Sequence, residues 1–142
     1  MKSMMLLAVM SSMLSVACET GKANDTLRNL PSSVYMYVSY GSDPKQVMDI
    51  YLPAGRTTSS TKLMFLIHGG SWSSGDKRDF QSYVDSLKLH LPHYAFVNVN
   101  YRLASFTDNK FPAQEEDIKS ALTFVMNKAG EYAISGLWMF TV

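Results

Sequence analysis

An apolar run followed by a glycine pair is the part of this sequence whose residue types could do chemistry. Leu63 to Ile67 are five consecutive apolar residues, and His68, Gly69 and Gly70 follow directly. Glycine has no Cβ, so its backbone N–H can approach another group closely. Two such N–H groups aimed at one oxygen can stabilise the charge of a tetrahedral intermediate. The alternative is a tight turn from a strand to a helix that has no chemical role.

Three serines, Ser71, Ser73 and Ser74, come directly after the glycine pair and are candidate nucleophiles. A catalytic serine on a strained strand-turn-helix elbow is flanked by glycines in the pattern Gly-x-Ser-x-Gly. None of the three serines has both of those glycines, and the pattern appears nowhere in the 142 residues. The sequence therefore argues against a nucleophile here. An active hydrolase that uses one of these serines with His90 or His93 as its base is the least favoured interpretation.

His90 and His93 could also be imagined as a pair of metal ligands. Leu91 and Pro92 lie between them, and no cysteine or carboxylate is spaced to complete a metal site. We expect both to be surface or loop histidines, and we expect no metal and no cofactor. Glu115, Glu116 and Asp117 similarly indicate the start of a helix rather than the paired carboxylates of a glycosidase.

Two apolar strands and a helix between them must position the glycine turn. Leu63 to Ile67 and Ala95 to Val99 have the continuous apolar character of strands covered on both faces, as in a parallel sheet. The helix is predicted over Lys77 to Leu89, with Asp76 as its N-cap. Its apolar residues recur at helical spacing: Phe80, Tyr83, Val84, Leu87 and Leu91. Together these segments predict one βαβ unit.

The flanking segments extend this α/β arrangement in both directions. Val34 to Tyr40 and Gln46 to Leu52 are β-rich runs joined by turn residues, which predicts an antiparallel hairpin before the parallel sheet. Pro112 is expected to open a second helix that ends near Lys128 and Gly130. Its apolar residues also follow helical spacing: Ile118, Ala121, Leu122, Val125, Met126 and Ala129.

Length and composition indicate one globular domain with a packed core. The chain has 142 residues, of which 46% are apolar, and its net charge is +1. So balanced a charge argues against a nucleic-acid partner or electrostatic binding to an anionic membrane. The single cysteine excludes an internal disulfide, so stability must come from packing.

The N-terminus predicts export. Lys2 precedes an uncharged apolar run, Met4 to Ala17, which is too short to span a bilayer and is typical of a signal peptide over residues 1–17. Cys18 follows at once and is a candidate lipidation site of a bacterial lipoprotein, although Ser15 stands where that pattern prefers leucine. Membrane anchoring through Cys18, plain periplasmic or secreted export, and an uncleaved N-terminus stay open. Residues 18–33 are interpreted as a polar tether and residues 34–142 as the domain.

Five blocks in the same order resemble the α/β-hydrolase family of esterases and lipases, and the branch of secreted bacterial carboxylesterases and acetyl or feruloyl esterases most of all. The similarity runs from about Val34 to Ala133. The blocks are Met48 to Pro53, His68 to Trp72, Gly75 to Lys77, Asn100 to Leu103, and Phe111 to Ala113 with Asp117. The resemblance implies the N-terminal half of an α/β-hydrolase fold, a serine-nucleophile mechanism and a small ester as substrate.

The resemblance also implies roles for individual residues. The N–H groups of Gly69 and Gly70, with Ser71, would form the oxyanion hole, while His68 would orient the loop and would not act as a base. Trp72 is expected to be a packing residue or to line the acyl pocket, with an isolated surface ring as the alternative. Arg102 and Asp117 would hold the neighbouring loops.

In that family the serine, the acid and the histidine all come later in the chain than the residues present here. Instead the sequence continues with an apolar stretch, Ile134 to Val142, that could form a strand. The sequence therefore predicts a truncated, inactive form of a carboxylic ester hydrolase, with an uncovered sheet edge that could pair with another chain. The alternative is a non-enzymatic surface lipoprotein or binding module that retains half of the fold.

Overall fold

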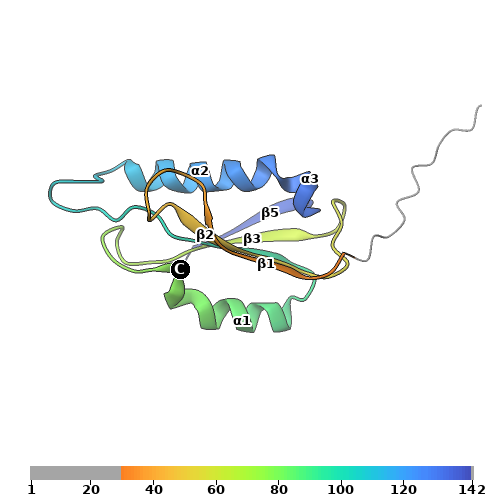
Figure 1. Cartoon of the computed structure of the whole chain (residues 1–142). Coiled ribbons are helices and arrows are strands. Elements are labelled where there is room, and N and C mark those ends of the chain that lie inside the picture. Colours follow the sequence, from red (N-terminus) through yellow and green to blue (C-terminus); the bar gives the residue numbers. More distant parts are fainter. Residues whose placement is uncertain (1–29, 142) are drawn as a thin grey trace, which may run out of the picture.

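A five-stranded mixed sheet lies between helices on its two faces (Figure 1). The computed structural model describes residues 30–141, and the side chains of residues 30–135. The strand order is β1-β2-β4-β3-β5; α1 covers one face, and α2 and α3 cover the other. The strands are β1 (Ser33–Ser39), β2 (Val47–Leu52), β3 (Lys62–Ile67), β4 (Ala95–Val99) and β5 (Gly136–Thr141). The helices are η1 (Lys77–Phe80), α1 (Gln81–His90), α2 (Ala113–Asn127) and α3 (Ala129–Tyr132).

The antiparallel part of the sheet confirms the predicted hairpin. β1 pairs antiparallel with β2, and β2 pairs antiparallel with β4. The register shifts between Tyr35 and Val38, and Tyr37 within this bulge has a φ of 55°. Bulges of this kind increase the local twist of an edge strand. Four apolar side chains of β1 remain largely exposed: Val34, Tyr35, Met36 and Tyr37. Pairing of a sheet edge with another chain stays a prediction.

The predicted βαβ unit is present, but its helix begins differently. β3 and β4 are parallel, and the five residues of β4 are all buried because helices cover both faces. Lys77–Phe80 is a 3₁₀ turn, and the α-helix starts only at Gln81. Asp76 caps the turn as predicted: its carboxylate accepts the Arg78 N–H, and the Asp79 carboxylate accepts the Asp76 N–H. This reciprocal capping box satisfies the first free donors within one tight turn.

The second predicted helix is also present and ends at the predicted place, with Lys128 as its C-cap, but Gly130 does not close it. α2 follows Pro112 and ends at Asn127, after which the short helix α3 continues the path. Gly130 lies inside α3 and does not terminate it. Ala133 takes that role instead, with the left-handed φ of 51° that closes many helices.

The apolar C-terminal run forms the edge strand β5. It pairs in parallel with β3, and Thr141 lies beside Ile67 in the register. The carboxyl ends of β3, β4 and β5 therefore meet at one edge of the sheet, the edge where ligands bind in open α/β sheets.

Successive residues of the strands contribute to two core layers, as the two-residue period of a strand requires. The layer beneath α2 and α3 contains Ile50, Phe65, Val97, Ala121 and Val125, among others. The layer beneath α1 contains Tyr51, Met64, Leu66, Phe80, Val84 and Phe96. Tyr83, which helical spacing placed on the apolar stripe of α1, is instead 60% exposed. The helical spacing therefore predicted the buried face of α1 correctly, except for Tyr83 at the margin of that face.

Arg56 joins the start of the described chain to the body of the domain. Its guanidinium donates to the carbonyl of Pro31 and to that of Tyr132, and its side chain is buried. Residues 30–33, which the sequence placed in the tether, are thus part of the fold, and Ser33 already belongs to β1.

The predicted signal peptide, Cys18 and the rest of the tether lie outside the described residues, so export and lipidation stay predictions. Among residues 30–141, no helix is both long and apolar enough to cross a membrane.

Candidate active site

The glycine turn forms a closed loop at the carboxyl end of β3. The Gly70 carbonyl accepts the N–H groups of Ser73 and Ser74 at 3.1 and 3.0 Å, and the Ser74 hydroxyl at 3.1 Å. Gly70 has a φ of 112°, and a Cβ placed there would lie 2.2 Å from the Ser74 carbonyl oxygen. Only glycine fits such a position. Gly70 is therefore required by the loop itself.

A second glycine lets the two ends of the loop touch. Gly75 has a φ of 97°, and a Cβ there would lie 2.5 Å from Nδ1 of His68 and 2.6 Å from the Gly69 carbonyl oxygen. The residue that leaves the loop thus packs directly on the residues that enter it. This contact fixes the loop as one compact unit from His68 to Gly75.

The backbone donors at the tip of the loop have no partner in the described part of the chain. Among the backbone of residues 30–141 and the side chains of residues 30–135, no acceptor receives the N–H groups of Gly69, Gly70 or Ser71, and all three residues are exposed. Ser71 and Trp72 both have positive φ, at 51° and 64°. Non-glycine residues in this region are strained, and such strain clusters at functional sites. The loop thus presents free N–H donors on a backbone that is held out of its relaxed conformation.

His68 lies beneath the loop, where it is 3% exposed. Its ring stacks on Tyr101 at a centroid distance of 4.3 Å, and the Tyr101 hydroxyl donates to the His68 carbonyl at 2.8 Å. Nδ1 lies 2.8 Å from the Gly69 carbonyl oxygen, which can only accept, so Nδ1 carries the proton in this contact. The geometry suits a residue that orients the loop and not a base that meets solvent. Burial raises the pKa of the Tyr101 hydroxyl.

Trp72 joins the glycine loop to the loop that follows β4. Its ring packs edge-on against Tyr101 at 5.2 Å, and its carbonyl accepts the Ala104 N–H at 2.8 Å. The indole is 45% exposed. It therefore both packs against Tyr101 and presents apolar surface beside the free donors.

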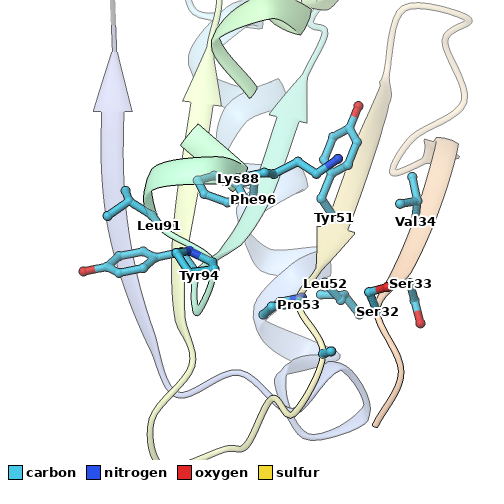
Figure 2. Close-up of a pocket in the computed structure, with 12 residues that line it drawn as sticks. Ser32, Ser33, Val34, Tyr51, Leu52, Pro53, Lys88, Leu91, Tyr94 and Phe96 are labelled. Carbon is cyan, nitrogen blue, oxygen red and sulfur yellow. The ribbon is translucent and has the colours of Figure 1, made fainter. Parts of the chain in front are cut away.

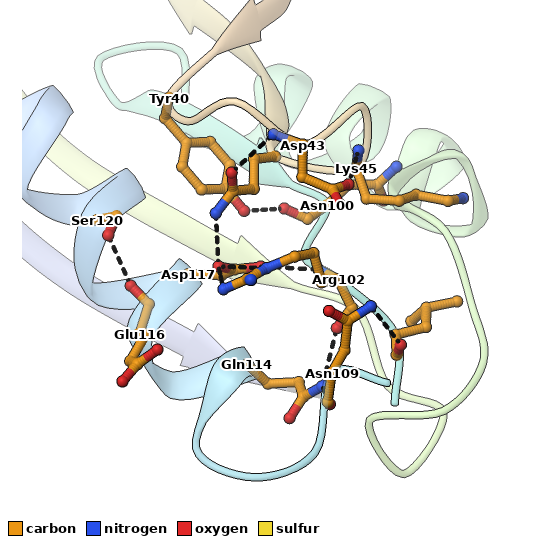
Figure 3. A network of polar contacts seen from close by, with 12 residues as sticks. Tyr40, Asp43, Lys45, Asn100, Arg102, Asn109, Gln114, Glu116, Asp117 and Ser120 are labelled. Atoms are coloured by element: carbon orange, nitrogen blue, oxygen red, sulfur yellow. Dashed lines mark hydrogen bonds and ion pairs between the residues drawn. The ribbon is translucent and has the colours of Figure 1, made fainter. Parts of the chain in front are cut away.

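Arg102 and Asp117 form an ion pair near the site (Figure 3). The guanidinium makes a bidentate pair with the carboxylate, with Nη2 and Oδ1 2.6 Å apart, and the Arg102 N–H donates to Oδ2 at 2.8 Å. Gln46 donates to the same carboxylate at 2.7 Å. The Asp117 side chain is only 1% exposed. The contact ties the loop after β4 to the start of α2 and to the hairpin.

Acidification should weaken this contact. Burial alone would raise the pKa of Asp117, but hydrogen bonds from Arg102 and Gln46 outweigh burial and hold the pKa below its ordinary value. The folded state then binds fewer protons than the unfolded state. The stabilisation is present above about pH 4 and is lost as the pH falls through the folded pKa.

We expect Asp117→Asn to lower the free energy of unfolding by about 1.5–3 kcal/mol at pH 7, and by less as the pH falls to 3. Urea titrations at several pH values measure the difference. Asp85→Asn, on the exposed face of α1, is the control and should stay within about 0.5 kcal/mol of the wild type at pH 7. An Asp117→Asn deficit that does not shrink at low pH contradicts the prediction.

The structure separates the serines from the remaining histidines. α1 runs from the loop edge back toward the start of β4, so His90 and His93 lie near the opposite edge of the sheet, and both are exposed. The hydroxyl groups of Ser73 and Ser74 donate to the Gly70 carbonyl. A base from His90 or His93 is therefore not available to a serine of the loop, and that interpretation was wrong.

A hollow of about 230 Å³ lies at this opposite edge (Figure 2). The end of α1, the start of β4 and the start of β1 contribute to its lining. Its lining includes Tyr51, Leu52, Pro53, Leu91, Tyr94 and Phe96. The Lys88 ammonium lies 5.0 Å from the centroid of the Tyr51 ring. This hollow is separate from the glycine loop, which sits at the carboxyl ends of the parallel strands.

Sequence reasoning missed the role of Tyr101, and it gave Asp49, Lys77, Asn98 and Asn100 no role as individual residues. All five are buried near the loop. The available indications were polar residues inside otherwise apolar strands, at Asp49 and Asn98. Buried polar side chains require partners, so each of them predicts an unseen contact even where its partner cannot be named.

Comparison with known proteins agrees with this architecture. The sequence profile of the BD-FAE family matches residues 48–139, which covers the loop, both crossover helices and most of β5. The chain belongs to the BD-FAE family. It is also 26% identical over 87 residues to esterase LipC of Mycobacterium tuberculosis, and 34% identical over 80 residues to arylacetamide deacetylase of Bos taurus.

Those matches cover 61% and 55% of this BD-FAE family chain but only 21% and 19% of the two relatives. The chain thus spans about a fifth of the length of the curated relatives it matches. Among solved structures, a bifunctional GH43-CE protein of Bacteroides eggerthii has a TM-score of 0.62 at 30% identity, over 76% of this chain and 15% of that one.

A truncated form of a carbohydrate esterase from gut microbiota has the same TM-score at 24% identity, over 80% of this chain and 40% of that one. The described residues have the N-terminal part of an α/β-hydrolase fold. At family level, this chain resembles carboxylic ester hydrolases.

Proposed function

We propose that this chain forms the oxyanion-binding side of a serine-type carboxylic ester hydrolase, and that residues 1–142 alone do not turn over esters. The observation that carries the proposal is the set of free N–H donors at Gly69, Gly70 and Ser71, on a strained loop at the carboxyl edge of the sheet. Donors fixed in this way stabilise the oxyanion of acyl transfer because they need no reorganisation during the reaction.

The topology is compatible with a nucleophile at the same edge of the sheet as the free donors, on a segment that would follow β5. Thr141 pairs beside Ile67, the last residue of β3, and His68 opens the glycine loop in the next position. A segment that continued past β5 would enter the same edge of the sheet. A strand followed by a tight turn into a helix is the geometry that presents a Gly-x-Ser-x-Gly serine. A nucleophile placed there would face the free donors across one sheet edge.

The known contributions of a nucleophile and of an oxyanion donor to turnover predict that residues 1–142 alone are inactive. Loss of the serine nucleophile of a protease reduced turnover by about 10⁶-fold, whereas one oxyanion donor contributes about 10²–10³-fold. An oxyanion-binding loop without a nucleophile is therefore nearly inert. The small ester substrate, which the family resemblance implies, would bind between this loop and the segment that supplies the serine.

Complementation tests the proposal. Residues 1–141 are fused to the segment that follows the equivalent strand in the carbohydrate esterase from gut microbiota, so that the fusion contains a Gly-x-Ser-x-Gly elbow. We expect the fusion to hydrolyse p-nitrophenyl acetate at least about 10³-fold faster than the 142-residue chain, which should not exceed the background rate.

Two controls make the result decisive. The fusion with its elbow serine replaced by alanine should return to the background rate, and a p-nitrophenyl phosphonate should inactivate only the unmodified fusion. A fusion that unfolds cooperatively yet shows no turnover contradicts the esterase assignment and favours the non-enzymatic binding module. Serine-independent turnover by the 142-residue chain contradicts its proposed inertness.

A further inference from the structure

Two sequence blocks far apart in the chain meet through a buried ion pair. Asp49 lies in β2, and Lys77 is the first residue after the loop and its cap. Nζ of Lys77 lies 2.5 Å from Oδ2 of Asp49, and each side chain is only 2% exposed. Charged side chains are almost never buried so completely without a specific pairing. The pair therefore marks a position that the fold holds closely.

The bulge of the edge strand β1 contacts the same ion pair. The other carboxylate oxygen of Asp49 accepts the Tyr37 N–H at 2.8 Å, and the Tyr37 ring lies 3.9 Å from Nζ of Lys77. Tyr37 is the positive-φ residue of the β1 bulge. A cation over an aromatic face gains electrostatic energy, and more so when it is desolvated. The bulge thus presents the Tyr37 backbone to Asp49 and its ring to Lys77.

The backbone of Lys77 is held as firmly as its side chain. Its N–H donates to Oδ1 of Asn100 at 2.5 Å, and its carbonyl accepts from Nδ2 of Asn98 at 2.7 Å. Asn98 belongs to β4, and Asn100 follows it directly. Lys77 is therefore fixed by contacts to β1, β2 and the end of β4 at once.

This anchor is connected to the free N–H donors over a short path. Asp76, next to Lys77, accepts from Nδ2 of Asn100 at 3.1 Å. Gly75, one residue earlier, packs against His68 and the Gly69 carbonyl. The loop thus has two fixed stems, β3 on one side and Lys77 on the other. Release of the Lys77 side chain would remove the contacts of this stem to β1 and β2, and only the backbone contacts to Asn98 and Asn100 would hold it.

We propose that Lys77 is a positioning residue, which acts through Asp49 to fix the far stem of the loop and with it the direction of the N–H groups of Gly69 and Gly70. The structural part stands on the contacts above, and the catalytic part rests on the proposed function. Donors must be held in the productive geometry before the charge develops, and a shift of about 1 Å can reduce a rate by about 10²-fold.

Nitrogen-15 relaxation on the full 142-residue chain tests the structural part. In the wild type we expect order parameters of about 0.85 at Gly69, Gly70 and Ser71, as in rigid backbone, and in Lys77→Met values below about 0.6. Lys128→Met, which removes an exposed ion pair with Glu131, is the matched control and should leave the loop rigid. A role in overall stability alone would leave the order parameters of the folded variant unchanged.

The complemented fusion tests the catalytic part. In the fusion, Lys77→Met should reduce kcat by about 10–10²-fold with KM within about two-fold, because the lost interaction matters mainly in the transition state. Low kcat together with a mobile loop supports the proposal. An unchanged kcat overturns the catalytic part, even if the loop becomes mobile.

Two outcomes overturn the structural part. One is a Lys77→Met loop as rigid as the wild-type loop, and the other is a wild-type loop with order parameters already below about 0.6, which needs no variant. If Lys77→Met does not fold, Asp49→Asn/Lys77→Met removes both charges and is measured in its place. The order parameters decide the role of Lys77 even if the fusion is inert, so the two proposals fail separately.

Discussion

Asp49→Ala should lower the free energy of unfolding by about 3–5 kcal/mol, because it leaves the Lys77 ammonium buried without its counter-charge. Lys77 is 2% exposed, so water cannot take the place of the carboxylate without opening the sheet edge. The change also removes the acceptor of the Tyr37 N–H. Urea titration monitored by circular dichroism at neutral pH measures the loss.

Two controls accompany this variant. One breaks an exposed ion pair, and the other replaces both charges of the buried pair with apolar side chains. Asp85→Ala removes the exposed pair with Lys88, whose atoms are 3.8 Å apart, and should change stability by less than about 1 kcal/mol. Asp49→Leu/Lys77→Met should recover most of the loss, since apolar replacements of a buried pair are often nearly neutral. An Asp49→Ala effect as small as that of Asp85→Ala contradicts this account.

Gly70→Ala should reduce ester hydrolysis by the complemented fusion by about 10²–10³-fold, as expected for loss of one oxyanion donor. The new Cβ would lie 2.2 Å from the Ser74 carbonyl oxygen, so the loop must open to admit it. Opening the loop redirects the N–H groups of Gly69 and Gly70. Steady-state hydrolysis of p-nitrophenyl acetate gives kcat and kcat/KM for comparison.

Gly55→Ala is the matched control because it introduces a methyl group at another positive φ, 66°, with no atom within 4 Å of the new Cβ. It should leave turnover unchanged within about two-fold, although it is destabilised by a similar backbone strain of about 1 kcal/mol or more. If Gly70→Ala retains wild-type turnover in a folded fusion, these N–H groups are not the oxyanion donors.

The sequence predicted the elements around the loop because local patterns define them. The apolar runs at β3 and β4, the hairpin of β1 and β2, and the stripe of α2 follow from hydrophobic periodicity and turn residues. Asp76 was recognised as a cap because its chemistry is local to the turn that follows it. These features involve residues within a few positions of one another.

Two predictions were wrong at positions where the local sequence was compatible with two conformations or two degrees of burial. Glycine often ends a helix, yet Ala133 provides the left-handed residue that closes α3, and Gly130 stays helical. Helical spacing placed Tyr83 on the apolar face of α1, yet the core buries Phe80 and Val84 and leaves Tyr83 exposed. Tertiary packing made both choices.

The sequence by itself determined the family, the α/β order of elements and the glycine turn that presents free N–H donors, because each is recorded in adjacent residues or in a fixed spacing. Only the tertiary structure decided that Lys77 pairs with Asp49, and that Tyr101 supports His68. These partners are separated by 28 and 33 residues. No periodicity connects them, since strand pairing and the burial of charge select each contact only when the sheet forms.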